Sequence, residues 1–228
     1  MINGGITMGL DMYLNRAPKY KDTTIEQINA VESYLNWNNN PRAKEYTLKK
    51  WCGVDEKDLP SLDVQDYYKQ FFTTKYYYWD KDKQFGHGSI REEIGYWRKA
   101  NAIHKWFVDK IQDGEDDCGY YKVDKDQLEE LLKTCKIVKD KCNLIDGQVS
   151  NGQHLENGKW VTDYEDGQVI ENKEIAEELL PTQGGFFFGS TDYDEWYMRD
   201  IDDTITILEK VLAETNFENQ IVFYSSSW

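Results

Sequence analysis

The 228 residues predict a helix-rich α+β single domain (residues 1–228) with a small antiparallel sheet. Residues 9–14 alternate apolar and polar side chains with a period of two, which indicates a half-buried strand. Residues 221–224 are apolar, β-branched and aromatic, which indicates a second strand near the C-terminus. We expect these N- and C-terminal strands to pair in one sheet.

The chain between the two strands has mostly helical spacing. The clearest pattern lies between Ile90 and Ile111, where apolar side chains recur at intervals of three and four. The expected helices run from Thr23 or Thr24 through Leu35, from Thr47 to near Gly53, from Leu62 to Tyr78, from Ile90 to Ile111, from Asp124 through Val138, and from Ser190 or Thr191 through Leu212.

Residues 144–171 predict a β-hairpin excursion within the domain. Four Asn-Gly or Asp-Gly pairs occur there, and such pairs favour two-residue hairpin turns because both turn positions need a positive φ. The pair Asn157–Gly158 separates two short strand-like runs, so we expect the hairpin turn at that point.

Composition limits the class of protein. Aromatic residues make up 14% of the chain, enough to build a core although the mean hydropathy is only -0.78. No apolar stretch is long enough to span a membrane, and the first residues do not resemble a secretory signal. The four cysteines show no CxxC spacing, so we expect no metal, no cofactor and a reducing, cytoplasmic setting.

The charge is unevenly distributed. Residues 1–114 hold 17 basic and 16 acidic residues, whereas residues 115–228 hold 10 basic and 26 acidic ones. With a net charge of -15 the chain is unsuited to binding duplex nucleic acid directly. The acidic half either serves solubility or faces a basic partner protein.

Residues 67–110 combine aromatic and basic side chains. They hold 13 aromatic and nine basic residues against five acidic ones. Rings that stack on a base and cations that meet phosphates suit a nucleotide-like ligand, although most of these rings can equally be core residues. On the expected 90–111 helix the candidate ligand-binding residues are Trp97, Arg98, Asn101, His104 and Lys105.

The run GGFFFGSTDYDEWY at residues 184–197 is the second candidate region. Acidic residues in the expected first helical turn already complement the helix dipole, which disfavours anion binding there. Thr191 and Asp194 have the spacing of a capping box. Hydroxyl and carboxylate groups here can instead receive a ribose, an amide or a cation; the candidates are Thr191, Asp192, Tyr193, Asp194 and Trp196.

Three motifs give a family resemblance. They are MGLDMYL at residues 8–14, EIGYWRKANAIHKWF at 93–107 and FFFGSTDYDEWY at 186–197. On these motifs the chain resembles an uncharacterised family of small proteins encoded by phages and prophage-like elements. The resemblance implies an accessory role such as counter-defence in the cytoplasm of an infected bacterial host, and it implies that residues 1–7 precede the usual family start.

Three functions stay open on the sequence. The first is non-enzymatic sequestration of a nucleotide-like signalling ligand. The second is an acidic surface mimic that inhibits a basic host defence or nucleic-acid-binding enzyme by protein–protein contact. The third, ranked last because no motif fixes its geometry, is a nucleotide-modifying enzyme that uses His104 and Asp192 or Asp194. The sequence leaves open whether the chain forms a homo-oligomer.

A pocket would connect the two candidate regions. We expect the 90–111 helix to lie beside the start of the final helix, with Arg98 or His104 reaching Asp192, Tyr193 or Asp194.

Overall fold

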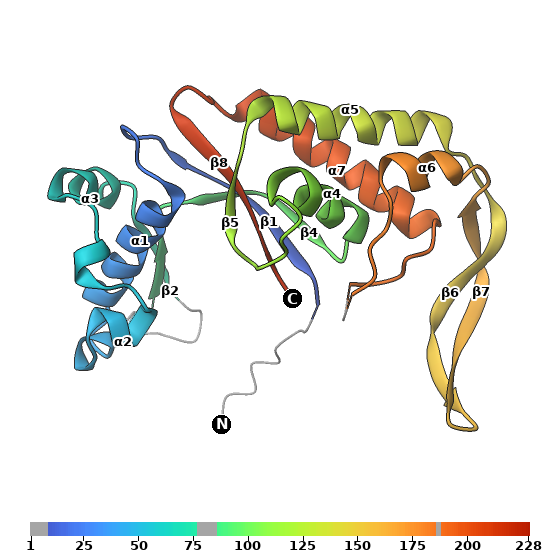
Figure 1. The fold of residues 1–228 in the computed structure, drawn as a ribbon, viewed down its shortest axis with the longest axis horizontal. Helices are drawn as coiled ribbons and strands as arrows, with labels where there is room; N and C mark the ends of the chain where they lie inside the picture. Colours follow the sequence, from blue (N-terminus) through green and yellow to red (C-terminus); the bar gives the residue numbers. More distant parts are fainter. Residues whose placement is uncertain (1–8, 77–85, 186–187) are drawn as a thin grey trace. The chain divides into compact units, whose positions relative to one another are not determined.

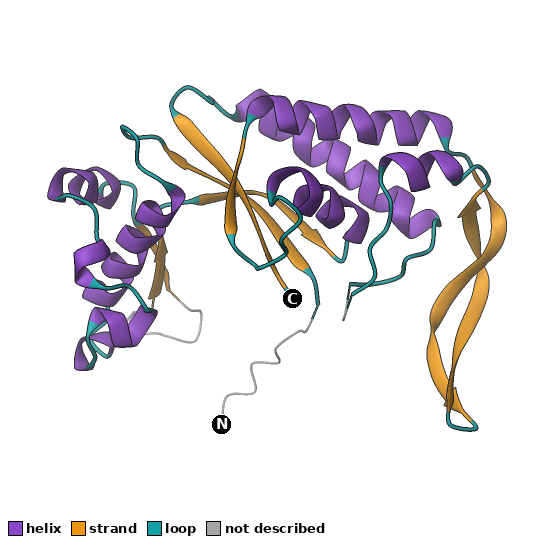
Figure 2. Ribbon diagram, in the orientation of Figure 1, coloured by secondary structure: helices purple, strands orange, loops and turns teal. Residues whose placement is uncertain are grey.

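A computed structural model describes residues 9–76, 86–185 and 188–228 (Figure 1). The α-helices are α1 (Ile25–Asn39), α2 (Leu48–Cys52), α3 (Leu62–Lys69), α4 (Asn101–Ile111), α5 (Lys125–Lys141), α6 (Glu174–Leu179) and α7 (Glu195–Glu214). The strands are β1 (Asp11–Pro18), β2 (Thr73–Tyr76), β3 (Gly86–Ser89), β4 (Glu92–Arg98), β5 (Tyr120–Val123), β6 (Leu144–Glu156), β7 (Lys159–Ile170) and β8 (Gln220–Ser227). Figure 2 shows the two kinds of element, and the short 3-10 turns Ala43–Glu45 and Glu56–Asp58 flank α2.

The main sheet confirms the α+β class. It is antiparallel with strand order β4-β1-β8-β5, so the two terminal strands are neighbours, as expected. Leu10, Met12 and Leu14 are fully buried, as the alternation before and within β1 predicts. Phe223 and Tyr224 are fully buried in β8.

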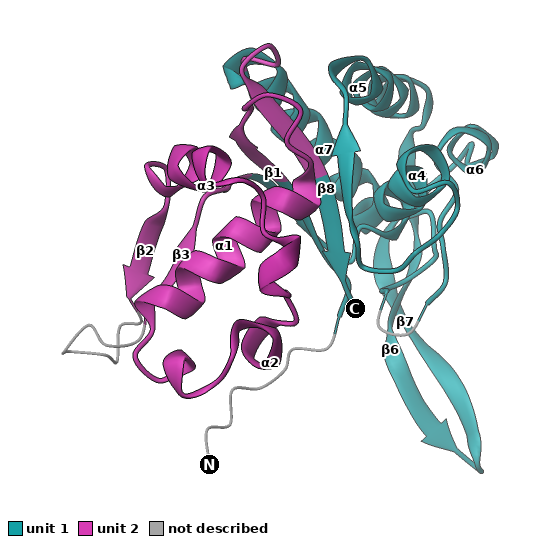
Figure 3. Ribbon diagram, turned by 60° about the vertical axis from the view of Figure 1, so that its left-hand side comes forward, with its two compact units in different colours: residues 1–14, 94–215, 224–228 teal, residues 15–93, 216–223 magenta. Residues whose placement is uncertain are grey.

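The chain divides into two compact units that are interleaved in sequence (Figure 3). Unit 1 comprises residues 1–14, 94–215 and 224–228, and unit 2 comprises residues 15–93 and 216–223. Strands β1, β4 and β8 each contribute residues to both units. The expectation that residues 1–228 form one domain stays a prediction.

Unit 2 is built around α1. Thr24 caps this helix through a capping box with Gln27, and the apolar face of the helix packs into the core of the unit. The core side chains are Ala17, Ile25, Ile28, Val31, Leu35, Val64, Tyr68, Ile90 and Phe223.

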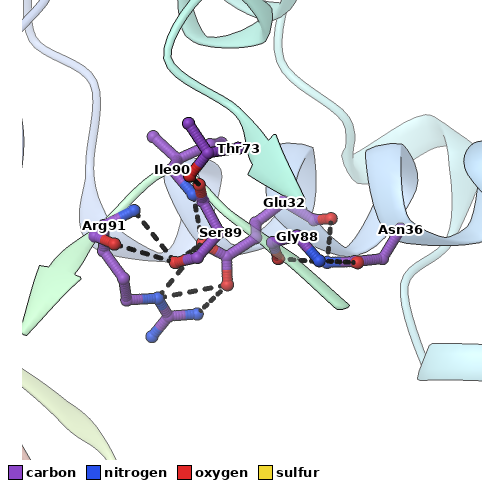
Figure 4. A network of polar contacts seen from close by, with 7 residues as sticks. All are labelled: Glu32, Asn36, Thr73, Gly88, Ser89, Ile90 and Arg91. Carbon is purple, nitrogen blue, oxygen red and sulfur yellow. Dashed lines mark hydrogen bonds and ion pairs between the residues drawn. The ribbon is translucent and has the colours of Figure 1, made fainter. Parts of the chain in front are cut away.

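A buried carboxylate ties α1 to β3 and the residues that follow it. Glu32 accepts hydrogen bonds from the Ile90 backbone N–H at 2.8 Å and from the Arg91 guanidinium at 2.5 Å (Figure 4). One turn further along α1, Asn36 exchanges two hydrogen bonds with the Gly88 backbone. Burial favours the neutral acid, but the bonds from Arg91 and Ile90 outweigh it and lower the pKa of Glu32.

Unit 1 packs α5 along α7, and the two helices run side by side (Figure 1). Asp124 begins α5 through a capping box with Gln127, as its position in the sequence predicts. The buried side chains of the pair are Leu128, Leu131, Cys135 and Val138 on α5 and Ile201, Leu208 and Val211 on α7.

The hairpin excursion is confirmed as the β6–β7 ribbon between α5 and α6. Its two-residue turn is Asn157–Gly158, and both residues have positive φ angles, 49° and 77°. The pairing slips between Ser150 and Gln153, where Gly152 has a φ of 98°.

Three helix expectations are wrong. Residues 92–98 of the expected 90–111 helix form strand β4, in which buried Gly95 and Trp97 alternate with the more exposed Ile94, Tyr96 and Arg98. The helix expected from Leu62 to Tyr78 ends at Lys69, and strand β2 follows. Tyr77 and Tyr78 lie outside the described residues.

The third wrong expectation concerns the start of the final helix. It begins at Glu195, and its cap is Asp194, whose Oδ1 accepts the backbone N–H groups of Trp196 and Tyr197. The capping box expected between Thr191 and Asp194 is therefore absent.

Candidate ligand pocket

A pocket of about 470 Å³ lies within unit 1. Its walls come from the end of β4, the start of α4, Thr182, residues 189–192 and the first turns of α7, with Ser150 of β6 also lining it. Its volume falls in the range that holds a small organic ligand. The two regions singled out in the sequence therefore share one cavity.

Asn101 builds one wall of the pocket. Its amide donates to the backbone oxygens of Phe188 (3.2 Å) and Ser190 (2.7 Å) and accepts from the backbone N–H of Gln183 (3.0 Å). The side chain is buried, and these three bonds hold Gln183, Phe188 and Ser190 against the start of α4. Asn101 is thus a positioning residue, because its polar atoms are committed to the protein itself.

Lys99 separates β4 from α4 in an uncommon backbone conformation. Its φ is 62°, in the left-handed region that ordinary residues rarely adopt. Gly189 opposite it also has a positive φ of 92°, and a Cβ added there would lie 3.3 Å from the Lys99 Cβ. Glycine therefore allows the pocket wall to approach Lys99 closely. Within the described residues Lys99 forms no ion pair.

Arg98 and Tyr96 form the neighbouring part of the wall on the exposed face of β4. Tyr96 donates its hydroxyl proton to Asp11 Oδ1 at 2.5 Å, and Arg98 Nη1 lies 3.5 Å from the same oxygen. Arg98 is half exposed, so its charge is only partly neutralised.

Five residues in the first turns of α7 line the pocket: Tyr197 and four others that share one side of the helix. Trp196, Arg199, Asp200 and Asp203 recur at intervals of three and four, which places them on one side of the helix. Trp196 is 54% exposed, and the Arg199 guanidinium lies 5.7 Å from the centre of its ring. This side of α7 offers a flat ring, a cation and two carboxylates.

Asp200 has an unusual electrostatic environment. Burial, with the charges of Asp203 and Asp194, raises the pKa of Asp200 to about 7, and Arg199 opposes the shift. No hydrogen bond from a described residue stabilises its carboxylate. A carboxylate in this state attracts a ligand that brings hydrogen-bond donors.

Asp194 has an unpartnered oxygen. The side chain is buried, and while Oδ1 caps α7, Oδ2 has no hydrogen-bond partner among the described residues. Burial raises the pKa of Asp194, although the backbone N–H groups of Tyr197 and Trp196 act in the opposite direction. The pocket thus contains carboxylate oxygens, on Asp194 and Asp200, that accept no hydrogen bond from a described residue.

His104 does not line the pocket and belongs to a separate buried chain of hydrogen bonds. Its Nδ1 lies 2.7 Å from the Tyr224 hydroxyl and its Nε2 lies 2.9 Å from Asp116 Oδ2. Burial raises the pKa of Tyr224, so the phenol keeps its proton in this buried contact. Asp116 also accepts from Trp228 Nε1 at 3.1 Å.

Of the ten residues predicted to bind a ligand, six line the pocket: Trp97, Arg98, Asn101, Asp192, Asp194 and Trp196. The other four, His104, Lys105, Thr191 and Tyr193, do not line it. Lys105 pairs with Asp109 at 2.7 Å, the Thr191 carbonyl accepts from Thr182 Oγ1, and the Tyr193 hydroxyl accepts from the Thr182 N–H.

The expected reach of Arg98 or His104 to Asp192, Tyr193 or Asp194 is wrong. Arg98 pairs instead with Asp11, and His104 contacts Asp116. Both acids lie far in the sequence from residues 192–194.

Sequence reasoning missed Lys99, Arg199, Asp200 and Asp203 as pocket residues. The last three continue the helical spacing from Trp196, and that spacing was the available signal. It was obscured because the same helix carries a stronger apolar stripe toward α5.

Within residues 9–76, 86–185 and 188–228, no group of three or more His, Cys, Asp or Glu side chains is arranged to hold a metal ion. In the same ranges, no helix has both the length and the apolar character that crossing a bilayer requires. Comparison with family models, with curated proteins and with solved structures gives no match.

Proposed function

We propose that this protein binds and sequesters a small nucleotide-like ligand without transforming it. The observation that carries the proposal is the 470 Å³ pocket, in which the sequence runs 96–102 and 189–200 meet. The pocket offers an exposed indole for stacking, cations at one wall and carboxylates on α7. Flat, polar ligands with both an anionic group and hydrogen-bond donors match this combination.

The two cationic residues at the β4 end suit the anionic part of such a ligand. Lys99 has no acidic partner in the described residues, and Arg98 shares Asp11 with Tyr96. A phosphate placed between them gains charge-assisted hydrogen bonds. The acidic side chains of α7 then face the opposite part of the ligand.

The proposal is tested by isothermal titration calorimetry with mononucleotides, cyclic dinucleotides and ADP-ribose derivatives. We expect binding of at least one of them and a loss of at least ten-fold in affinity in Lys99→Ala, with the melting temperature unchanged. Lys105→Ala is the matched control, because Lys105 lies on the adjacent helix α4 and pairs with Asp109. Absence of heat with every ligand refutes the proposal. Formation of a product would show that the protein is an enzyme and would contradict binding without transformation.

The biological setting follows from the resemblance to phage-encoded proteins, and it is part of the proposal. In that setting the ligand is a signal of bacterial immunity, and the protein acts in the host cytoplasm by lowering the free concentration of that signal. Expression of the Lys99→Ala variant in a host that carries such a defence system would then fail to protect an infecting phage.

A second candidate function is inhibition of a basic host protein through the β6–β7 ribbon. Trp160 and Leu155 form a cross-strand pair and are 70% and 61% exposed, and Tyr164 lies on the same face of the ribbon. Residues 144–171 hold six acidic residues and one lysine. Exposed rings beside carboxylates are typical of a surface that docks a basic protein.

The second candidate predicts that binding of a basic target enzyme weakens as the salt concentration rises. A double variant, Trp160→Ser with Tyr164→Ser, should abolish capture of a basic target enzyme and leave nucleotide binding intact. Capture that persists in this variant excludes the ribbon as the docking surface.

A further inference from the structure

We infer that Asp200 recognises the two adjacent N–H donors of a guanine-type base whose ring packs against Trp196. The inference rests on the proposed function and names the class of base that the pocket takes.

The geometry of α7 places a ring and a carboxylate at the right spacing. Trp196 and Asp200 are four residues apart, so their side chains are neighbours on one side of the helix. Both line the same pocket. A flat ring that packs against the indole therefore presents its edge to Asp200.

The chemistry of this end of the pocket selects the edge. Asp200 receives no hydrogen bond from a described residue, and buried Asp194 keeps an unpartnered oxygen. The site is rich in acceptors, so a ligand fits best when its edge brings adjacent donors. Among the common bases, only guanine has two adjacent N–H donors, N1–H and N2–H, that can both bond to one ionised carboxylate.

Arg199 supports the same choice. The guanine O6 acceptor lies next to N1–H, and an arginine beside the recognising carboxylate can donate to it. Arg199 precedes Asp200 and lines the same pocket. Its guanidinium lies over one face of the Trp196 ring, so in the proposed complex the base packs against the other face of the indole. Hypoxanthine lacks the N2–H donor and xanthine replaces it with an acceptor, so both lose one of the two bonds to Asp200.

The recognition depends on pH because only the ionised carboxylate accepts both bonds. With its pKa raised to about 7, Asp200 is mostly ionised at pH 8 and mostly protonated at pH 6. A protonated carboxyl donates one bond and no longer matches two donors. The charged or titratable groups that share the pocket with Asp200 are Asp194, Tyr197, Arg199 and Asp203 on or next to α7, Asp192 before it, and Tyr96, Arg98 and Lys99 from β4 and the residue after it.

The test compares GMP, IMP and XMP by calorimetry at pH 8 and pH 6. At pH 8 we expect GMP to bind at least ten-fold more tightly than IMP or XMP, since the loss of one hydrogen bond to a charged group costs about that factor. At pH 6 the preference should fall several-fold. Asp200→Asn should reverse the preference toward XMP, because its amide donates one bond and accepts the other.

Asp202→Asn is the matched control. Asp202 lies on α7 but pairs with Lys139, 2.5 Å away, and does not line the pocket. It should leave the preference for GMP unchanged. Equal binding of the three nucleotides overturns the inference and leaves the proposed function standing. Binding of guanidinium or spermidine with no binding of any nucleotide overturns both.

Discussion

Glu32 in unit 2 and Asp200 in unit 1 are both carboxylates largely removed from water, yet their pKa values move in opposite directions. The protein surrounds Glu32 with donors from Ser89, Ile90 and Arg91, so its charge is stabilised and its pKa is lowered. Asp200 has acidic neighbours and no hydrogen bond from a described residue, so its pKa rises to about 7. The difference separates a carboxylate that holds the fold together from one whose partner must come from outside.

The largest expected effect tests the structural member of this pair. Glu32→Gln removes a buried carboxylate charge that accepts hydrogen bonds from Arg91 and the Ile90 backbone, so the free energy of unfolding should fall by about 3–5 kcal/mol. Urea denaturation measures the change. Glu209→Gln removes an exposed pair with Lys136 and should cost less than about 1 kcal/mol. Equal losses in the two variants would contradict the comparison.

His104 extends the comparison to a group that was predicted to bind a ligand. His104→Ala leaves a cavity and removes the partner of both Tyr224 and Asp116, so we expect a loss of about 2–4 kcal/mol. Nucleotide affinity should not change. His154→Ala is the control, because His154 pairs with Asp163 in an exposed position and should cost less than about 0.5 kcal/mol. Loss of nucleotide binding in His104→Ala but not in the control would show that His104 contributes to the ligand site.

The sign of the pH dependence sharpens the contrast. The folded protein binds the Asp200 proton more tightly than the unfolded chain does, so this group lowers stability progressively as pH rises from about 4 to about 7. Glu32 acts in the opposite sense, since its contribution is present above its unfolded pKa and is lost as pH falls.

Asp200→Asn isolates the first of these two effects. At pH 8 the variant should be more stable than the parent by on the order of 2 kcal/mol, a value reduced for partial solvent exposure. Near pH 4 the difference should vanish. Thermal unfolding across this pH range measures it, and a constant difference at all pH values would show that Asp200 titrates normally.

The smallest expected effect concerns Lys99. Lys99→Gly relieves the left-handed backbone at a φ of 62° and should raise stability by about 0.5–1 kcal/mol while weakening ligand binding. Lys105→Gly, in the middle of α4, should lower stability by about 1 kcal/mol. If both glycines destabilise equally, the backbone at Lys99 is not strained.

The fold class, both terminal strands and the hairpin turn were predictable because each depends on local signals. Alternation gave β1, and Asn157–Gly158 gave the turn. Strand β4 was missed because Tyr96, Ala100 and Ile103 also satisfy a helical spacing. Long-range contacts favour the strand over the helix. A Cβ at Gly95 would lie 2.7 Å from Ile207 of α7, and the Trp97 indole N–H donates to Thr204 of the same helix.

For the candidate site, the sequence predicted only that residues from the 93–107 and 186–197 regions would line one pocket. Trp97, Arg98 and Asp194 were identified by their unusual neighbours in the sequence. The partners of His104 and Arg98 were not predicted, because the sheet and a loop bring Asp116, Tyr224 and Asp11 to them. No local pattern encodes such pairings.

The pairing of β1 with β8 also has a consequence for how the protein is made. The two neighbouring strands are separated by roughly 200 residues of chain, so the centre of the sheet forms only after residues 220–227 have left the ribosome. Until then β1 has an open edge on the side that β8 will occupy. Contacts between such distant segments slow folding. We therefore expect α5 to be helical early in synthesis and the sheet to appear last.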